Sequence, residues 1–481
     1  MRNDGWHAHG LRQLLDYWGL DSSDTSTPID KVARALDSHV DTARSWEVLA
    51  ALTAQVPTAA EVVGLVREVR LNGAAVSLDR IEYDRAATMF GPTGDVLFIR
   101  GAVMIDVHDT SQTNRTTGIQ RVVRETVGRW TSHAEVLPVA WTHDHRSLRL
   151  LTAVELDQLR GRHVDASIAD TEPHTIVVPL GGRFVIPELA AEPWRVLLHR
   201  SIAEHSGIAV AAIGYDLVPV TSSETSHAGI IANFPRYLDT LAHAERVAAI
   251  SRAAAIEYEG WRQMLSGSGR IGPEIVAIPL AAEMIGQTAS VTAPEILEDS
   301  TERASVLVVG SHEPRKNHLA VLDAARGLWD SGLEFELCFI GGSSWASGEF
   351  EQTVEDLKRL ERPITVLSAV GDAELSKAYE RAAFTMFPSL NEGFGLPIAE
   401  SLAHGTPVIT SNYGSMKEIA DDSGGCLLVD PRDDDQIRAA MRSLLTDGAL
   451  LAELRRAART ARTKTWDEYA AEVYDYLVRG A

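Results

Sequence analysis

FTMFPSLNEGFGLPIAESLAHGTPVIT, residues 384–410, holds two short apolar runs separated by a glycine-rich loop and an expected helix. The apolar runs are FTMFPS at the start and PVIT at the end, and the helix is expected to begin at Pro397. Continuous apolar strands that alternate with amphipathic helices are typical of a parallel sheet covered on both faces. This stretch therefore predicts one strand–helix–strand unit of a doubly wound α/β domain.

The same alternation extends on both sides of that unit. Apolar runs at 304–310, 335–342, 364–370 and 426–430 predict the other strands of this domain, and the tail from Asp434 is expected to be helical. An earlier series of runs predicts a second sheet, at residues 102–107, 175–180, 207–213, 246–251 and 275–280. Residues 281–301 are polar and interrupt the pattern, so we place the domain boundary there.

Four segments follow from this pattern. Residues 1–95 are predicted to be a helical extension, 96–285 an amino-terminal Rossmann-like domain, and 286–465 a carboxy-terminal Rossmann-like domain. Residues 466–481 are expected to form a C-terminal helix that can cross back to the amino domain. In open α/β sheets ligands bind at the carboxyl ends of the strands, so the cleft between two such domains is the expected site.

Composition excludes several classes of partner. The net charge is −22, which argues against nucleic acid or an anionic membrane bound through a basic surface. Only two cysteines are present, and the start has no apolar segment of signal-peptide type. No run of 18 clean apolar residues is found. We therefore expect a cytoplasmic protein without an integral membrane segment, with no zinc-type ligand cluster.

The loop in the opening stretch carries the strongest chemical signal. Gly393 and Gly395 permit a tight turn, and Pro397 suits the first turn of a helix. Residues 393–396, which include Phe394 and Leu396, should then present free backbone N–H groups to an anion such as a diphosphate. Glu400, one turn into the helix, is placed to accept ribose hydroxyls, and Glu392 lies nearer the outer end of the ligand.

A second loop carries adjacent cations. The strand at 304–310 ends at Gly310, and Arg315 and Lys316 precede the helix from His318. Arginine binds phosphate bidentately and lysine acts as a point charge. Alone the pair is typical of a solvated surface, but with the glycine loop of the same domain it predicts a phosphate site.

These motifs resemble the retaining glycosyltransferases of the GT-B fold, family 4, also called glycosyl transferases group 1, and among them bacterial mannosyltransferases. The E-x7-E motif is Glu392 to Glu400, the phosphate loop is Glu313–Asn317, and residues 370–375 are similar to the family's strand–loop before a helix. The match is looser over 105–279 and does not extend to residues 1–95.

The resemblance implies that the acceptor binds the amino domain, 96–285, and the nucleotide sugar the carboxy domain, 286–465. It also implies a catalytic set and a binding set of residues. Arg315, Lys316 and Glu392 would be catalytic, with the two cations stabilising the leaving diphosphate. The donor would contact Gly310, the backbone near Val370, residues 393–396 and Glu400. Thr117 and Gly118 would face the cleft from the amino domain, as would Tyr215 and Asp216, which stand where many relatives have a His-Asp pair. His108, beside Asp106, is an alternative cleft histidine.

The expected reaction is transfer of a hexose from a nucleotide sugar to a glycan, lipid-linked glycan or small-molecule hydroxyl, without metal or cofactor. GDP-mannose is the favoured donor, with UDP- and dTDP-sugars open. Three other hypotheses remain: a glycoside hydrolase that uses Glu392 and Glu400, a sugar-nucleotide epimerase, and a non-catalytic subunit of the same fold that binds nucleotide or glycan. A homodimer through residues 1–95 is also possible from the sequence.

Overall fold

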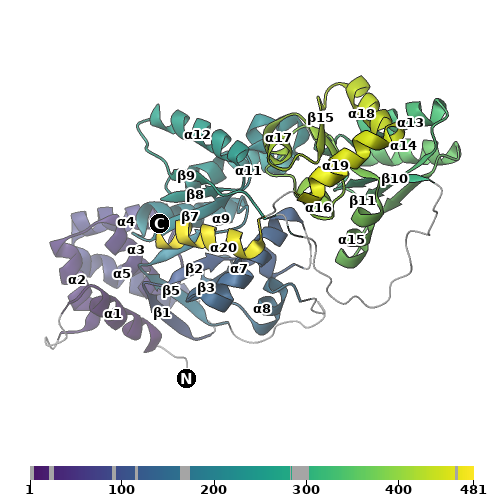
Figure 1. Cartoon of the computed structure of the whole chain (residues 1–481). Helices are drawn as coiled ribbons and strands as arrows, with labels where there is room; N and C mark the ends of the chain where they lie inside the picture. The colour runs from purple at the N-terminus through teal and green to yellow at the C-terminus, as the bar shows by residue number, and fades with distance from the viewer. Residues whose placement is uncertain are drawn as a thin grey trace.

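The computed structural model describes residues 5–20, 26–88, 94–113, 117–162, 174–281, 283, 303–460 and 464–480. Two α/β domains lie side by side, each with helices on both faces of its sheet, and a group of N-terminal helices packs beside the first domain (Figure 1). This confirms the predicted fold class. Within the described ranges no helix is both long and apolar enough to cross a bilayer.

The amino domain has a nine-stranded sheet in the described residues, in the order β1-β5-β4-β3-β2-β6-β7-β8-β9. Its strands are β1 (Val96–Arg100), β2 (Val103–Asp106), β3 (Val136–Trp141), β4 (Leu148–Leu150), β5 (Ile176–Leu180), β6 (Arg183–Ile186), β7 (Ala209–Gly214), β8 (Arg246–Ala249) and β9 (Glu274–Ala277). Its helices are α6 (His108–Ser111), α7 (Gly118–His133), α8 (Ala153–Leu159), α9 (Pro193–His205), α10 (Val218–Thr221), α11 (Ala228–Leu241) and α12 (Arg252–Ser266).

Two predictions for this domain need correction. The sheet is not wholly parallel, because β4 runs antiparallel to both β3 and β5. A tight connection from Trp141 to Leu148 makes β3 and β4 a hairpin, which a search for continuous apolar runs does not detect. The five apolar runs predicted for this domain also miss β1, β3, β4 and β6, which are short or half-buried.

The carboxy domain contains a six-stranded, fully parallel sheet in the order β12-β11-β10-β13-β14-β15. Its strands are β10 (Ala304–Val309), β11 (Phe335–Ile340), β12 (Ile364–Leu367), β13 (Phe384–Phe387), β14 (Val408–Ser411) and β15 (Cys426–Val429). Its helices are α13 (His318–Asp330), α14 (Gly348–Arg359), α15 (Asp372–Arg381), α16 (Leu396–Ala403), α17 (Gly414–Ser423), α18 (Asp434–Thr446) and α19 (Gly448–Thr460). The strand order reverses between β10 and β13, which is the switch point of a Rossmann sheet.

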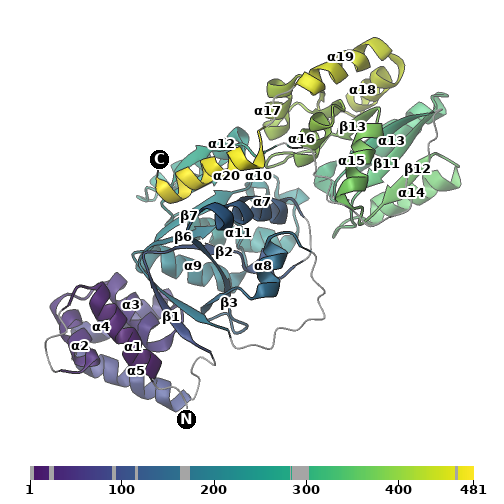
Figure 2. The same cartoon turned by 60° about the horizontal axis from the view of Figure 1, so that its bottom comes forward.

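The N-terminal segment forms a helical bundle on the outer edge of the amino domain (Figure 2). It consists of α1 (Gly5–Tyr17), α2 (Pro28–Ser38), α3 (Thr42–Thr53), α4 (Ala59–Asn72) and α5 (Ala74–Thr88). Helix α1 packs against β1, and α4 packs against α9. The bundle therefore extends the amino-domain core and lies far from the carboxy domain in both views.

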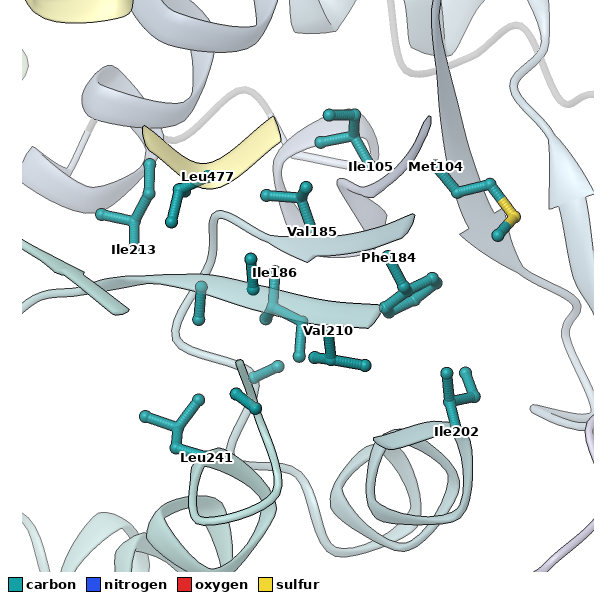
Figure 3. Close-up of a cluster of buried hydrophobic side chains, with 14 of the residues drawn as sticks. Met104, Ile105, Phe184, Val185, Ile186, Ile202, Val210, Ile213, Leu241 and Leu477 are labelled. Atoms are coloured by element: carbon teal, nitrogen blue, oxygen red, sulfur yellow. The ribbon is translucent and has the colours of Figure 1, made fainter. Parts of the chain in front are cut away.

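The C-terminal segment returns to the amino domain. Helix α20 (Trp466–Tyr474) packs along α7, where the Trp130 Nε1–H donates to the Ala470 carbonyl oxygen at 2.8 Å. The following turn, η3 (Asp475–Arg479), inserts Leu477 among apolar side chains of β6 and β7 (Figure 3). Two covalent connections thus join the domains, one before β10 and one before α20.

A buried charge cluster lies inside the amino domain, at the carboxyl end of β2. The Arg195 side chain is fully buried, and its Nε donates to Asp106 Oδ2 at 3.0 Å while its Nη2 donates to Glu188 Oε2 at 2.6 Å. His199 Nε2 lies 2.6 Å from the same Asp106 oxygen. Burial alone would raise the pKa of Asp106, but Arg195 and His199 hold it below its usual range.

Replacement of Arg195 by methionine should destabilise the protein strongly, because two buried carboxylates lose their shared cation. Removing one partner of a buried pair costs about 3–5 kcal/mol. Urea denaturation followed by tryptophan fluorescence measures the loss. The control is Arg200→Met on the same helix, where each of the surface pairs with Glu204 and Asp239 should contribute less than about 1 kcal/mol. Equal stability of the two variants would contradict the role given to the cluster.

Candidate functional site

Two loops meet at the switch point of the carboxy-domain sheet. One follows β10 and contains Gly310 and the short turn Pro314–Lys316, and the other follows β13 and runs from Pro388 to Gly395. Gly310 has φ +146°, a conformation that favours glycine. The loops are hydrogen-bonded to each other, because the Leu390 amide donates to the Arg315 carbonyl oxygen at 2.9 Å.

The predicted cations and the first predicted glutamate form one cluster. Lys316 Nζ lies 2.7 Å from Glu392 Oε1, and Arg315 Nη1 lies 2.5 Å from Glu392 Oε2. Arg315 also donates to the Asn391 carbonyl oxygen at 2.9 Å. All three charged side chains are at least four-fifths buried. The structure thus brings together residues that the sequence places 76 positions apart.

Burial and charge act in opposite directions on this cluster. Burial would raise the pKa of Glu392, but Arg315 and Lys316 lower it to about 2. Burial lowers the pKa of Lys316, although Glu392 opposes that shift. Glu392 is therefore ionised at neutral pH, and it holds Arg315 and Lys316 together at the end of β10. Arg315 Nη2 also donates to Glu313 Oε2 at 3.1 Å.

The loop after Glu392 is fixed through its carbonyl groups. Ser415 Oγ donates to the Glu392 carbonyl oxygen at 2.8 Å, and Ser251 Oγ of the amino domain donates to that of Gly393 at 2.7 Å. The amides of residues 393–396 donate to no described residue. Gly395, with φ +110°, immediately precedes α16, so these free N–H groups lie at a helix N-terminus, where an anion is stabilised.

Glu400 has partners from both domains. Its Oε2 accepts a hydrogen bond from the Tyr379 hydroxyl at 2.8 Å, and its Oε1 is bound by Arg121 of α7. Burial and the neighbouring Glu400 raise the pKa of Tyr379 well above its usual value. A carboxylate has about four lone-pair sites, so one on each oxygen remains for a further donor.

Of the predicted amino-domain residues, some lie against the carboxy domain and others do not. Gly118 approaches the carboxy domain, since a Cβ there would lie 3.5 Å from Leu396 Cδ1. Asp216 lies against the loop, because a Cβ on Gly393 would be 3.0 Å from Asp216 Oδ2. Thr117 is exposed before α7. Tyr215, expected to face the cleft, instead points into the amino domain, where its hydroxyl donates to the Pro187 carbonyl oxygen at 2.6 Å.

The remaining predicted donor residues are apolar and contribute mainly packing. Phe394 is buried, and Leu396 is half-buried against the core that the two domains share. Val370 packs in the small cluster that contains Tyr379. The preceding Ala369 has φ +56°, so the chain turns sharply before α15.

Two residues of the site were not predicted from the sequence. Arg121 lies three residues after Gly118, on the same face of α7 as the helix start, and that spacing was the available signal. Tyr379 had no local signal, because only the fold brings α15 beside Glu400. Among the described residues no group of three or more histidine, cysteine or acidic side chains is arranged to hold a metal ion.

Comparison with known proteins fits this geometry. Residues 292–461 match the family model described as Glycosyl transferases group 1. The chain is 25% identical over 332 residues to the serotype-specific mannosyltransferase WbdA of Escherichia coli. The matched region covers 66% of this chain and 38% of that protein. It is 37% identical over 142 residues to O-antigen chain mannosyltransferase B of Escherichia coli. This matched region covers 29% of this chain and 36% of that protein.

A solved structure of Anabaena HepE in complex with UDP and glucose superposes with a TM-score of 0.55 at 12% identity, over 78% of this chain and 99% of that one. The protein therefore has the GT-B fold, and within its carboxy domain residues 292–461 match the glycosyl transferases group 1 model. The matched regions span less than two fifths of the two mannosyltransferases.

The Arg121–Glu400 pair should couple the stability of the two domains. In a double-mutant cycle with Arg121→Met and Glu400→Gln, we expect a coupling free energy of about 1–3 kcal/mol, because the carboxylate is buried. Chemical denaturation measures it. The control cycle is Arg252→Met with Asp422→Asn, an exposed pair that also joins the domains, with an expected coupling below about 1 kcal/mol. Equal couplings would contradict a special role for Arg121.

Proposed function

We propose that the protein is a retaining glycosyltransferase that moves a hexose, with mannose favoured, from a nucleotide sugar to a hydroxyl of a glycan acceptor. The observation that carries this proposal is the row of free amides at 393–396 beside the buried pair Arg315 and Lys316. Backbone donors and cations that converge on one point form an anion site suited to a diphosphate.

The chemistry needs charge stabilisation more than a proton-transfer group. The bond from the sugar C1 to the diphosphate oxygen breaks, and negative charge grows on the departing diphosphate. Arg315, Lys316 and the helix N-terminus stabilise that charge, and preorganised donors of this kind are a large source of catalysis. The acceptor oxygen then bonds to C1 on the same face, and its proton passes to a departing phosphate oxygen. We propose that no metal ion is required.

Mannose from GDP-mannose is the favoured donor sugar because the relatives named above are mannosyltransferases. UDP- and dTDP-sugars stay open, and the structural neighbour holds UDP with glucose. Glu400 is proposed to accept hydrogen bonds from the ribose hydroxyls on the lone-pair sites that Arg121 and Tyr379 leave unused.

Loss of Arg315 should remove most of the turnover. A charge-assisted hydrogen bond contributes about 1.5–3 kcal/mol, so Arg315→Ala should lower kcat/KM by roughly tenfold or more. The assay follows nucleoside diphosphate release from the nucleotide sugar with acceptor present, in EDTA. The control variant is Arg326→Ala, on the same domain and paired only at the surface.

Near-normal kinetics in Arg315→Ala would overturn the phosphate assignment, and loss of wild-type activity in EDTA would overturn the metal-free mechanism. Release of sugar to water without acceptor would favour a hydrolase. Nucleotide binding with no turnover on any acceptor would favour the non-catalytic subunit.

Donor binding should weaken as the pH rises through 6. Burial raises the pKa of Asp216 to about 6 despite the nearby Arg315. Asp216 is therefore protonated at pH 5 and ionised at pH 7.5, where it repels the diphosphate. Because a nucleotide sugar does not itself titrate in this range, its affinity should fall by roughly two- to tenfold over that interval. Calorimetry measures this, and Asp216→Asn should bind equally at both pH values. An unchanged pH dependence in the variant would contradict this prediction.

A further inference from the structure

A cavity of about 240 Å³ lies in the amino domain, separate from the Glu392 cluster. Its walls include His108, Gln112, Trp141, His145, Arg149 and Glu155. His108 follows β2 and Trp141 ends β3, and these two strands are parallel. Since β7 and β8 run in the same direction, the cavity lies on the sheet edge that carries Asp216 and Ser251, which contact the carboxy domain.

The charges in the cavity wall cancel. Arg149 Nη1 and Nη2 donate to the two oxygens of Glu155 at 2.6 and 2.5 Å, and both side chains are buried. Arg149 Nε donates to the Trp141 carbonyl oxygen at 3.1 Å, so the guanidinium is occupied. An anionic ligand would find no unpaired arginine or lysine among the described lining residues. The other titratable lining residues are the histidines His108, His143, His145 and His174. The wall thus holds no permanent unpaired charge and suits an uncharged ligand.

His108 supplies a neutral hydrogen-bond donor. Its Nδ1 accepts from the Trp141 backbone N–H at 3.3 Å, and that group can only donate. Gln112 Nε2 lies 3.0 Å from the same nitrogen. The proton must then be on Nε2, which bonds to no described residue. Burial lowers the pKa of His108 to about 4, so the ring stays neutral near pH 7.

Aromatic rings form a second wall, and a ring stack and a buried hydrogen bond fix their positions. His145 stacks on Trp194 with ring centroids 4.0 Å apart, and its Nδ1 is buried without a partner among the described residues. The Trp141 Nε1–H donates to Asp106 at 2.9 Å, in the charge cluster around Arg195. Flat apolar faces combined with a few fixed polar groups are typical of small-molecule sites.

We propose that this cavity binds one uncharged sugar ring of the acceptor, with the His108 Nε2–H donating to a ring hydroxyl. The proposal rests on the proposed function, since it assigns the acceptor side of that reaction. The cavity is smaller than the roughly 300–1,000 Å³ of typical ligand pockets, which agrees with a single ring. Selection against a phosphorylated ring follows from the paired charges of Arg149 and Glu155.

Binding can be tested without turnover. Saturation-transfer NMR on the full chain uses the methyl α-pyranosides of mannose, glucose and galactose at millimolar concentration, with mannose 6-phosphate for comparison. We expect at least one uncharged glycoside to give a signal. His108→Ala should weaken its binding about fivefold, the size of one lost hydrogen bond. Val154→Phe, which adds a larger side chain to the cavity wall from α8, should abolish it.

Two controls separate this proposal from the proposed function. His133→Ala, at an exposed end of α7, should leave glycoside binding unchanged. Nucleotide-induced thermal shifts should be unaffected in both cavity variants, which also shows that they fold. Three outcomes would overturn the cavity assignment: no glycoside signal, an unchanged signal in both cavity variants, or equal binding of mannose 6-phosphate. None of them would contradict the proposed nucleotide site. Nucleotide binding by the Arg315→Ala variant tests only the proposed function and not the cavity.

Discussion

The ion pairs of Glu392 with Arg315 and Lys316 fix the geometry on which the carboxy-domain site depends. They join the loop after β10 to the loop after β13 at the point where the strand order reverses. Once that carboxylate is held, the chain continues through Gly393 and Gly395 into α16 with its carbonyl groups bonded and its amides free. A buried carboxylate between two cations thus orients a row of neutral donors.

The amino domain completes this arrangement from the other side. Ser251 bonds to the Gly393 carbonyl, Asp216 packs against the same glycine, and Arg121 reaches Glu400. Trp466, at the start of α20, lies with its ring 5.9 Å from the Arg121 guanidinium, and its amide donates to Glu283 at 3.1 Å. Glu283 and Trp466, the described residues at the ends of the two connections, thus contact each other, and Trp466 lies beside the Arg121 that binds Glu400.

Much of the carboxy domain could be predicted from the sequence, because its strands are continuous apolar runs and its loops carry glycines and charges at fixed spacing. The strands of the amino domain were harder to predict from the sequence. Strands β3, β4 and β6 are short or half-buried and give no clean periodicity, and β4 reverses direction in a hairpin. The pairing of Arg121 with Glu400 joins residues 279 positions apart, so only the packed domains reveal it. Tyr215 was misplaced because its neighbour Asp216 does face the other domain.

The central claim is that the carboxy domain holds a nucleoside diphosphate at residues 392–400. A thermal-shift screen of the full chain against GDP, UDP, dTDP and ADP at millimolar concentration tests it most directly. A ligand at about 100 times its dissociation constant stabilises the folded protein by roughly 2.7 kcal/mol. The account predicts a clear rise in Tm with one of these nucleotides, and a smaller rise when Glu400 is replaced by glutamine. No rise with any of the four would contradict it.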